Sequence, residues 1–197
     1  MKKVLFLLLI FCKSVPSFAQ ITKPVYKVVP VITSHSFFLK GGSRAIIGNS
    51  SRQVLPINLP ANTVEWYYTI TTTNSRKQSS NSDLTAQLDK LLVPDLGITS
   101  NAFGAITVPG GSGICDVYVM TNPNEVNKYV NKKPAASFLM NDSRQNYISG
   151  LIQVKDFLYG SCFLVLRNPS ASQGLSVTIE VTAIVLTNAV SSSTAMQ

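Results

Sequence analysis

The chain has 197 residues, of which 45% are hydrophobic, 9% aromatic and 13% charged, with a formal net charge of +8. The low charged fraction excludes an intrinsically disordered chain, and also a long solvated helix or coiled coil, because both need many more charged residues. The length fits a single domain with one hydrophobic core.

The first segment of the chain has the features of a secretory signal peptide. Lys2 and Lys3 form a positive start, Val4–Phe11 is apolar, and Ser17-Phe18-Ala19 is typical of a cleavage site. The apolar stretch is shorter than the ~20 residues that a membrane-spanning helix needs. We therefore expect residues 1–19 to be a signal peptide, and the mature protein to be exported to the periplasm or the extracellular space, without a transmembrane segment. The short apolar stretch suggests a bacterial source.

Cleavage would remove three of the 17 basic residues and lower the formal net charge from +8 to +5. The remaining excess lies between Gln20 and Pro60, where no acidic residue occurs. The basic residues of this segment are Lys23, Lys27, Lys40, Arg44 and Arg52. These basic residues could form a face that binds anionic glycans or lipid headgroups, or they could be scattered charges that increase solubility. Nucleic acid is not an expected partner, because no basic run is interleaved with stacking aromatic residues.

Two cysteines remain once Cys12 is removed with the leader. Cys115 and Cys162 lie near small residues, in Gly113-Ile114-Cys115 and Gly160-Ser161-Cys162, at the start of apolar runs. An even pair in an exported protein predicts one disulfide. The alternatives are two free buried thiols and a reactive pair, but the chain has no C-x-x-C motif.

Alternating apolar and polar residues dominate the mature chain. Val64–Ile70 and Val177–Val185 both show the period of two that is typical of half-buried antiparallel strands. The further predicted strands are Ser36–Leu39, Arg44–Ile47, Gln53–Leu59, Ala105–Val108, Cys115–Thr121, Tyr147–Val154 and Cys162–Arg167. Short strands separated by turn residues predict an all-β fold, an antiparallel β-sandwich of jelly-roll type. We expect residues 20–187 to form this single domain and residues 188–197 to be a polar flexible tail.

Two short helices are predicted in the connections. Leu84, Leu88, Leu91 and Leu92 recur with helical spacing before Pro94, and we expect this helix to lie over one end of the sandwich. The second begins with Asn122 as N-cap, Pro123 at the first position and Glu125 at the third, which is typical of a helix start.

Catalytic and metal-binding motifs are missing from the sequence. His35 is the only histidine, so a Ser-His-Asp or Cys-His site would have to be built on it. A zinc site would need more His or Cys ligands, and no phosphate-binding or dinucleotide-binding glycine motif occurs. We therefore predict no catalytic residues, no metal and no cofactor. A calcium site using Asp116, Asn122, Asn124 or Asp142 is left open, although no EF-hand loop is present.

Four residues are the candidates for facing a ligand. Tyr67 is expected to be the exposed member of the Trp66-Tyr67-Tyr68 cluster, and Tyr118 is a second aromatic candidate. Asp116 and Asp142 each interrupt an otherwise neutral stretch. Together with Glu65 and Glu180, the two aspartates also supply the acids that a glycosidase pair would need.

Several segments resemble exported jelly-roll accessory domains, namely pre-peptidase C-terminal and GOLD-like domains. The segments that carry the resemblance are Asp116–Met120, Ser143–Asn146, Tyr159–Pro169 and Val177–Val185, with Leu55–Pro60 and Trp66-Tyr67-Tyr68 similar to the first half of those domains. The resemblance implies a non-catalytic sandwich that binds or stabilises another molecule, and it transfers no site residue. The Leu84–Leu92 helix is a departure from those small domains.

From these patterns we expect a non-enzymatic exported binding or interaction module whose partner is a protein or glycan of the cell envelope. The alternatives are a carbohydrate-active enzyme or glycan-binding domain that uses paired acids, and a self-associating structural subunit of the cell envelope. The sequence indicates neither the ligand nor the oligomeric state.

Overall fold

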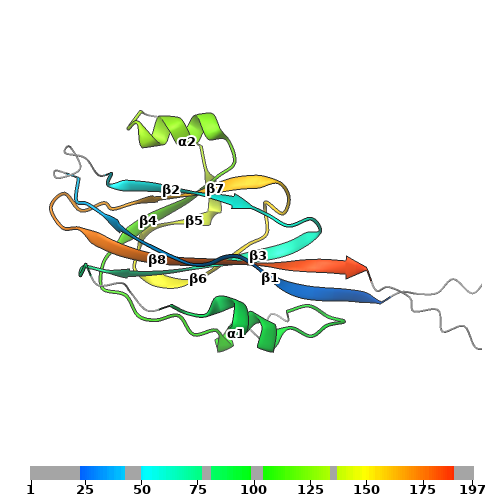
Figure 1. Ribbon diagram of the computed structural model, residues 1–197. Coiled ribbons are helices and arrows are strands. Elements are labelled where there is room, and N and C mark those ends of the chain that lie inside the picture. Colours follow the sequence, from blue (N-terminus) through cyan, green and yellow to red (C-terminus); the bar gives the residue numbers. More distant parts are fainter. Residues whose placement is uncertain (1–22, 43–49, 77–80, 99–103, 134–136, 189–197) are drawn as a thin grey trace, which may run out of the picture.

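The computed structural model describes residues 23–42, 50–76, 81–98, 104–133 and 137–188 (Figure 1). The predicted signal peptide, the predicted strand at Arg44–Ile47 and residues 189–197 of the predicted tail lie outside the described residues.

In the described parts of the chain, eight strands form two antiparallel sheets that pack face to face, so the predicted β-sandwich is confirmed (Figure 1). The strands are β1 (Pro24–Leu39), β2 (Arg52–Asn58), β3 (Thr63–Thr73), β4 (Cys115–Met120), β5 (Leu139–Tyr147), β6 (Ser149–Val154), β7 (Ser161–Arg167) and β8 (Leu175–Asn188). Sheet 1 has the order β1-β8-β3-β6, and sheet 2 has the order β2-β7-β4-β5. The pairing is nested, because β1 pairs with β8, β2 with β7, β3 with β6 and β4 with β5.

The alternation of the strands places their apolar faces between the sheets. Trp66, Tyr68 and Ile70 of β3 are fully buried in the core, as are Val177, Ile179 and Val181 of β8. The indole nitrogen of Trp66 donates a hydrogen bond to the carbonyl of Phe157 at 2.8 Å, so its polar edge is satisfied at the rim of the core. The predicted orientation is therefore confirmed for β8 and for β3 from Trp66 onward, whereas Val64, beside a register shift, packs on the outer face with Tyr67.

Two observed strands, and one predicted strand that is absent, differ from the sequence prediction. β1 begins at Pro24, twelve residues before the predicted Ser36, and its pairing with β8 shifts register on both sides of Ile32. Pro30 interrupts the alternating pattern, but β1 is the edge of sheet 1, where a proline is tolerated. β5 has the polar sequence LMNDSRQNY and was not predicted as a strand. The strand predicted at Ala105–Val108 is wrong, since this segment contains no strand.

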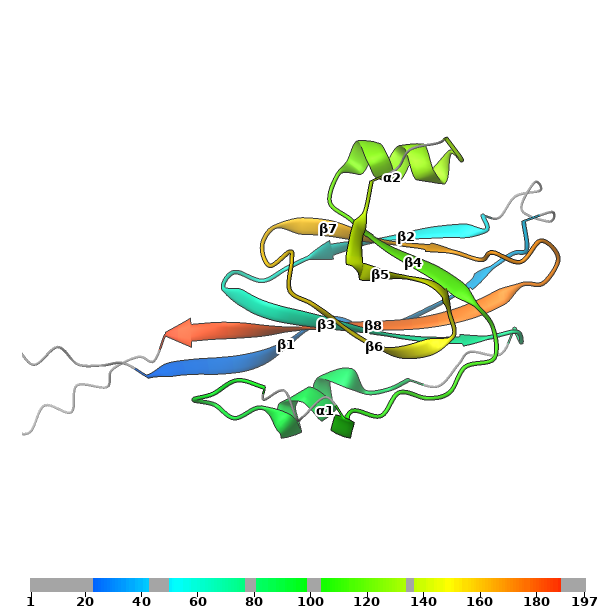
Figure 2. The ribbon, with the colours of Figure 1, turned by 180° about the vertical axis from the view of Figure 1, so that it is seen from behind.

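Each sheet carries one helix on its outer face (Figures 1 and 2). The helix α1 (Leu84–Leu91) packs Leu84 and Leu88 against Tyr67 and Ile184 of sheet 1, so it covers a face and not an end of the sandwich as predicted. The helix α2 (Pro123–Val130) packs Val126 against sheet 2. Its predicted start is confirmed, because the Asn122 side chain accepts a hydrogen bond from the backbone of Asn124 at 2.9 Å. No helix in the described ranges is long and apolar enough to cross a bilayer.

Candidate functional site

Asp116 lies on the outer face of sheet 2, where its side chain is almost completely buried. Its Oδ2 pairs with Arg167, which donates from Nε at 2.7 Å and from Nη2 at 2.5 Å. Its Oδ1 accepts a hydrogen bond from the backbone of Asn146 at 2.9 Å, a residue with the positive φ of 52°. Both oxygens of Asp116 are therefore occupied in joining β4 to β7 and β5.

Tyr118 is also buried, only 4% exposed, beneath α2 and the segment that follows it. Its ring contacts Tyr129 of α2 and Phe138, with centroid separations of 5.1 Å and 4.8 Å. Arg52 lies over the other ring of this cluster, 4.3 Å from the centroid of Tyr129. The geometry of Tyr118 is that of a packing residue.

The expectation that Tyr67 is exposed is wrong. Its side chain is fully buried, because α1 packs over the face of sheet 1 on which it lies. The amide of Gln153 donates to Glu65 at 2.5 Å and contacts the Tyr67 hydroxyl at 3.2 Å. Burial and the neighbouring carboxylate of Glu65 raise the pKa of Tyr67, so the phenol stays protonated.

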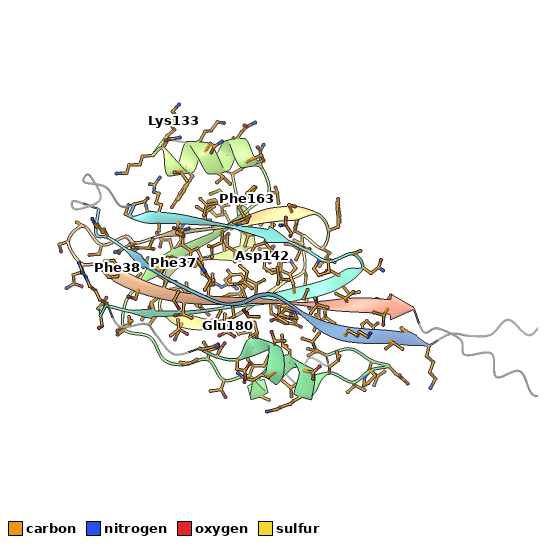
Figure 3. All side chains as sticks on the ribbon, in the orientation of Figure 1. Phe37, Phe38, Lys133, Asp142, Phe163 and Glu180 are labelled. Atoms are coloured by element: carbon orange, nitrogen blue, oxygen red, sulfur yellow. The ribbon has the colours of Figure 1, made fainter. Side chains whose placement is uncertain are left out.

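The side chain of Glu180 accepts hydrogen bonds from residues at the start of α1 (Figure 3). Its Oε1 accepts from the backbone and the hydroxyl of Ser82 at 2.6 and 2.8 Å, and its Oε2 accepts from the backbone of Leu84 at 2.7 Å. Asp83, the residue before the helix, makes no side-chain capping bond. A carboxylate of β8 therefore accepts hydrogen bonds from backbone N–H groups at the start of α1. The partial positive charge of a helix N-terminus favours a negatively charged group at this position.

Asp142 lies between the two sheets and is 4% exposed (Figure 3). Its carbonyl accepts a hydrogen bond from the Tyr68 hydroxyl at 2.6 Å, whereas its Oδ2 has no hydrogen-bond partner within the described residues. Burial, with a smaller contribution from the charge of Asp156, raises the pKa of Asp142 to about 6, and Arg144 opposes this shift.

The acids proposed for a glycosidase pair do not come together. Glu180 is opposite Thr69 in the ladder, four residues from Glu65, so a rise of ~3.3 Å per residue separates the two acids by roughly 13 Å. Glycosidase carboxyls are roughly 5–9.5 Å apart. Asp116 lies on the outer face of sheet 2, and Asp142 lies between the sheets. Among the described residues, no group of three or more His, Cys, Asp or Glu side chains could hold a metal ion.

The structure contradicts the predicted disulfide, because Cys115 and Cys162 are free, buried thiols. β4 and β7 are antiparallel with Met120 opposite Phe163, which places Cys162 six residues along the ladder from Cys115. This offset corresponds to roughly 20 Å, whereas disulfides join Cα atoms less than about 7 Å apart. Burial raises the pKa of both thiols to about 12, so neither is a reactive thiolate. The alternative of two free buried thiols is the correct one.

A different site lies at the end of the sandwich where β1, β3 and β7 finish and β8 begins. Three adjoining depressions of about 370, 270 and 340 Å³ share Phe38, Arg76, Asn74 and Gly174 at their junctions. We call them together the end groove. Its polar and charged lining residues are Ser36, Lys40, Asn74, Arg76, Ser112, Asn168, Ser170, Gln173 and Ser176. No acidic residue is among the described residues that line these depressions.

Hydrogen bonds between its segments hold the groove in shape. The buried amide of Asn168 donates to the carbonyls of Lys40 and Gln173 at 3.3 and 2.7 Å, and its oxygen accepts from the backbone of Ser170. On the other wall, Asn74 donates to the carbonyl of Ser112 at 2.7 Å. The walls are therefore tied by side chain to backbone bonds across distant parts of the sequence.

An aromatic ring and a guanidinium meet in the groove. Phe38 is half-buried, and Cζ of Arg76 lies 5.4 Å from the centroid of its ring. The ring packs directly on Gly174, where an added Cβ would lie 2.1 Å from Cζ of Phe38. Figure 3 shows Phe37 and Phe38 at the end of the molecule opposite the described chain ends.

A larger depression of about 620 Å³ adjoins Lys23, Pro24 and the segment Val93–Leu96. Its lysine is paired with Asp95 at 3.5 Å, so the charges within it are already matched. The end groove is the stronger candidate because its described lining contains two cations and no acidic residue.

Sequence reasoning missed the end groove. Its residues come from four separate segments and form no motif. One signal was present: Lys40 belongs to the acid-free segment between Gln20 and Pro60. All four residues singled out as ligand-facing, Tyr67, Tyr118, Asp116 and Asp142, are buried away from the groove. No protein-family model and no curated protein matches the chain.

Proposed function

We propose that the protein is a non-enzymatic binding module of the cell envelope and that the end groove holds its ligand. The observation that carries this proposal is a preformed surface with two cations, an aromatic ring and several hydroxyl and amide groups at one end of a rigid sandwich. Connecting segments presented by a rigid scaffold are common sites of recognition. The separation of the four candidate acids favours this proposal over a glycosidase.

We also propose that the sandwich is of jelly-roll type and that the chain is exported. The nested strand pairing supports the first proposal, since a jelly roll is an eight-stranded double sheet built from two Greek keys. The leader-like segment at residues 1–19 supports the second. Fractionation of the producing cells would place the protein in the envelope or the medium, and recovery from the cytoplasm alone would contradict export.

The binding proposal is tested by capturing envelope polysaccharides and envelope proteins on the immobilised full chain. Phe38→Leu removes the ring from the groove, and Gly174→Ala displaces it while keeping both cations. We expect the captured ligand to be lost or weakened about tenfold with both variants. Tyr159→Leu is the matched control, because this tyrosine is 81% exposed and precedes β7 at the opposite end of that strand. Equal capture by all four proteins would contradict a role for the groove.

A further inference from the structure

Resting on the proposed function, we infer that the ligand of the end groove is an acidic oligosaccharide. An anionic group on one sugar would pair with Arg76, and neighbouring sugar hydroxyls would bind the polar part of the groove. The inference depends on three features of the site: its charge, the arrangement of Arg76 on Phe38, and the chemistry of the adjoining depression.

The charge of the groove selects an anion. Lys40 and Arg76 both line the central depression, which no acidic side chain lines. Within the described part of the chain Arg76 has no ion-pair partner, in contrast to Arg167, which is paired with Asp116. A neutral ligand would leave the guanidinium of Arg76 without a counter-charge, whereas an anionic group in the same depression would pair with it.

The arrangement of Arg76 suits an oxyanion. Cζ of Arg76 lies over the ring of Phe38, 5.4 Å from its centroid. A guanidinium held beside the ring can form the bidentate pair that guanidinium groups make with carboxylates and similar oxyanions. Phe38 packs on the backbone of Gly174, and this contact fixes the position of the ring.

The adjoining depression suits a hydroxyl-rich ligand. Asn74, Ser112, Ser170 and Gln173 line it together with Ile114, so amide and hydroxyl groups lie in the same depression as an apolar side chain that is 41% exposed. The apolar contacts suit the C–H faces of a sugar, and the polar groups suit its hydroxyls. A simple anion would occupy only the central depression and would contact little of this second surface beyond the shared Asn74 and Gly174. An oligosaccharide with one anionic sugar contacts both.

Isothermal titration of the purified full chain with defined oligosaccharides tests this inference. The carboxylate probe is a tetragalacturonate, and its methyl ester is the matched neutral probe with the same sugar backbone. A sulfated galactose tetramer and free sulfate distinguish a sulfated sugar and a simple anion from the carboxylate. We expect an acidic tetramer to bind at least about tenfold more tightly than the methyl ester, with an affinity that falls as salt rises.

Two variants locate the binding. Arg76→Gln removes the charge and keeps a polar side chain, and we expect it to weaken binding of the acidic tetramer about tenfold with an unchanged melting temperature. Lys90→Gln, on the exposed side of α1, removes the same charge far from the groove and should leave binding unchanged.

Equal binding of the ester and the acid would overturn the inference and leave the groove as a neutral-glycan site, so the proposed function would stand. Binding of free sulfate as tightly as of the tetramers would overturn the oligosaccharide. No binding of any acidic probe would also overturn it, and the proposed function would then be decided separately by the capture experiment with Phe38→Leu.

Discussion

The carboxylate of Glu180 accepts a hydrogen bond from the backbone nitrogen of Leu84 at 2.7 Å, although the two residues are 96 positions apart in the sequence. Local sequence normally supplies the cap of a helix, but Asp83 has a left-handed backbone conformation with φ 53° and makes no capping bond. The start of α1 therefore depends on a strand of sheet 1, and α1 in turn buries Tyr67.

Removing the charge of Glu180 should destabilise the protein. In Glu180→Gln the side chain keeps one acceptor but places an amide donor against backbone donors, so we expect a loss of about 1–3 kcal/mol in the free energy of unfolding. Urea unfolding followed by circular dichroism measures it. Asp83→Asn is the matched control, because asparagine tolerates the left-handed conformation and no capping bond is lost. Equal stability of the two variants would show that Glu180 does not cap α1.

Asp142 should make stability depend on pH. Its pKa is raised to about 6 in the folded protein, above the ordinary value of 3.8, so the folded state binds the proton more tightly than the unfolded state. The stabilisation from this proton is complete below about pH 4 and is lost as the pH rises through 6.

Asp142→Asn should therefore stabilise the protein by on the order of 1–2 kcal/mol at pH 7.5 and by little at pH 4. Denaturant unfolding of the variant and the parent chain across this range gives the difference directly. Asp89→Asn, on the exposed side of α1, should change stability little at either pH. A constant difference between Asp142→Asn and the parent would contradict the shifted pKa.

The two cysteines should be unlinked and protected. We expect alkylation of denatured, unreduced protein to label both Cys115 and Cys162, and alkylation of native protein to be slow because both thiols are buried with a pKa of about 12. Peptide mapping by mass spectrometry identifies the labelled residues. Reductant should leave the melting temperature unchanged. A linked pair of peptides containing these two residues would contradict the register of β4 and β7.

The pair of Asp116 and Arg167 should stabilise sheet 2. Arg167→Gln leaves the carboxylate of Asp116 buried without its counter-charge, and we expect a loss of about 2–3 kcal/mol, because the arginine side chain is itself 38% exposed. Asp116→Asn also weakens the bond to Asn146. Combining the two substitutions should cost less than the sum of the single losses, by about 1 kcal/mol or more in urea unfolding. Simple additivity would show that the pair does not act as one unit.

Local patterns predicted the parts of the fold that depend on neighbouring residues. The core-facing residues of β8 and of β3 from Trp66 onward, and the cap of α2 at Asn122, were predicted correctly, because side-chain period and capping chemistry are local. Most of β1 was not predicted, because prolines normally interrupt a strand. The position of β1 at the edge of sheet 1 explains why its prolines are tolerated. The burial of Tyr67 needs the position of α1, and the separation of the cysteines needs the register of β4 and β7. The end groove is a tertiary feature of the same kind.

The antiparallel ladder that pairs Val25 with Thr187 brings the two described chain ends together at the pole of the molecule opposite Phe38 (Figures 1 and 3). An attachment made beside Val25 or Thr187, whether a sensor surface, a fluorescent label or a fused protein, is therefore separated from the end groove by the length of the sandwich. These positions suit the tethering of the protein in the binding measurements proposed above.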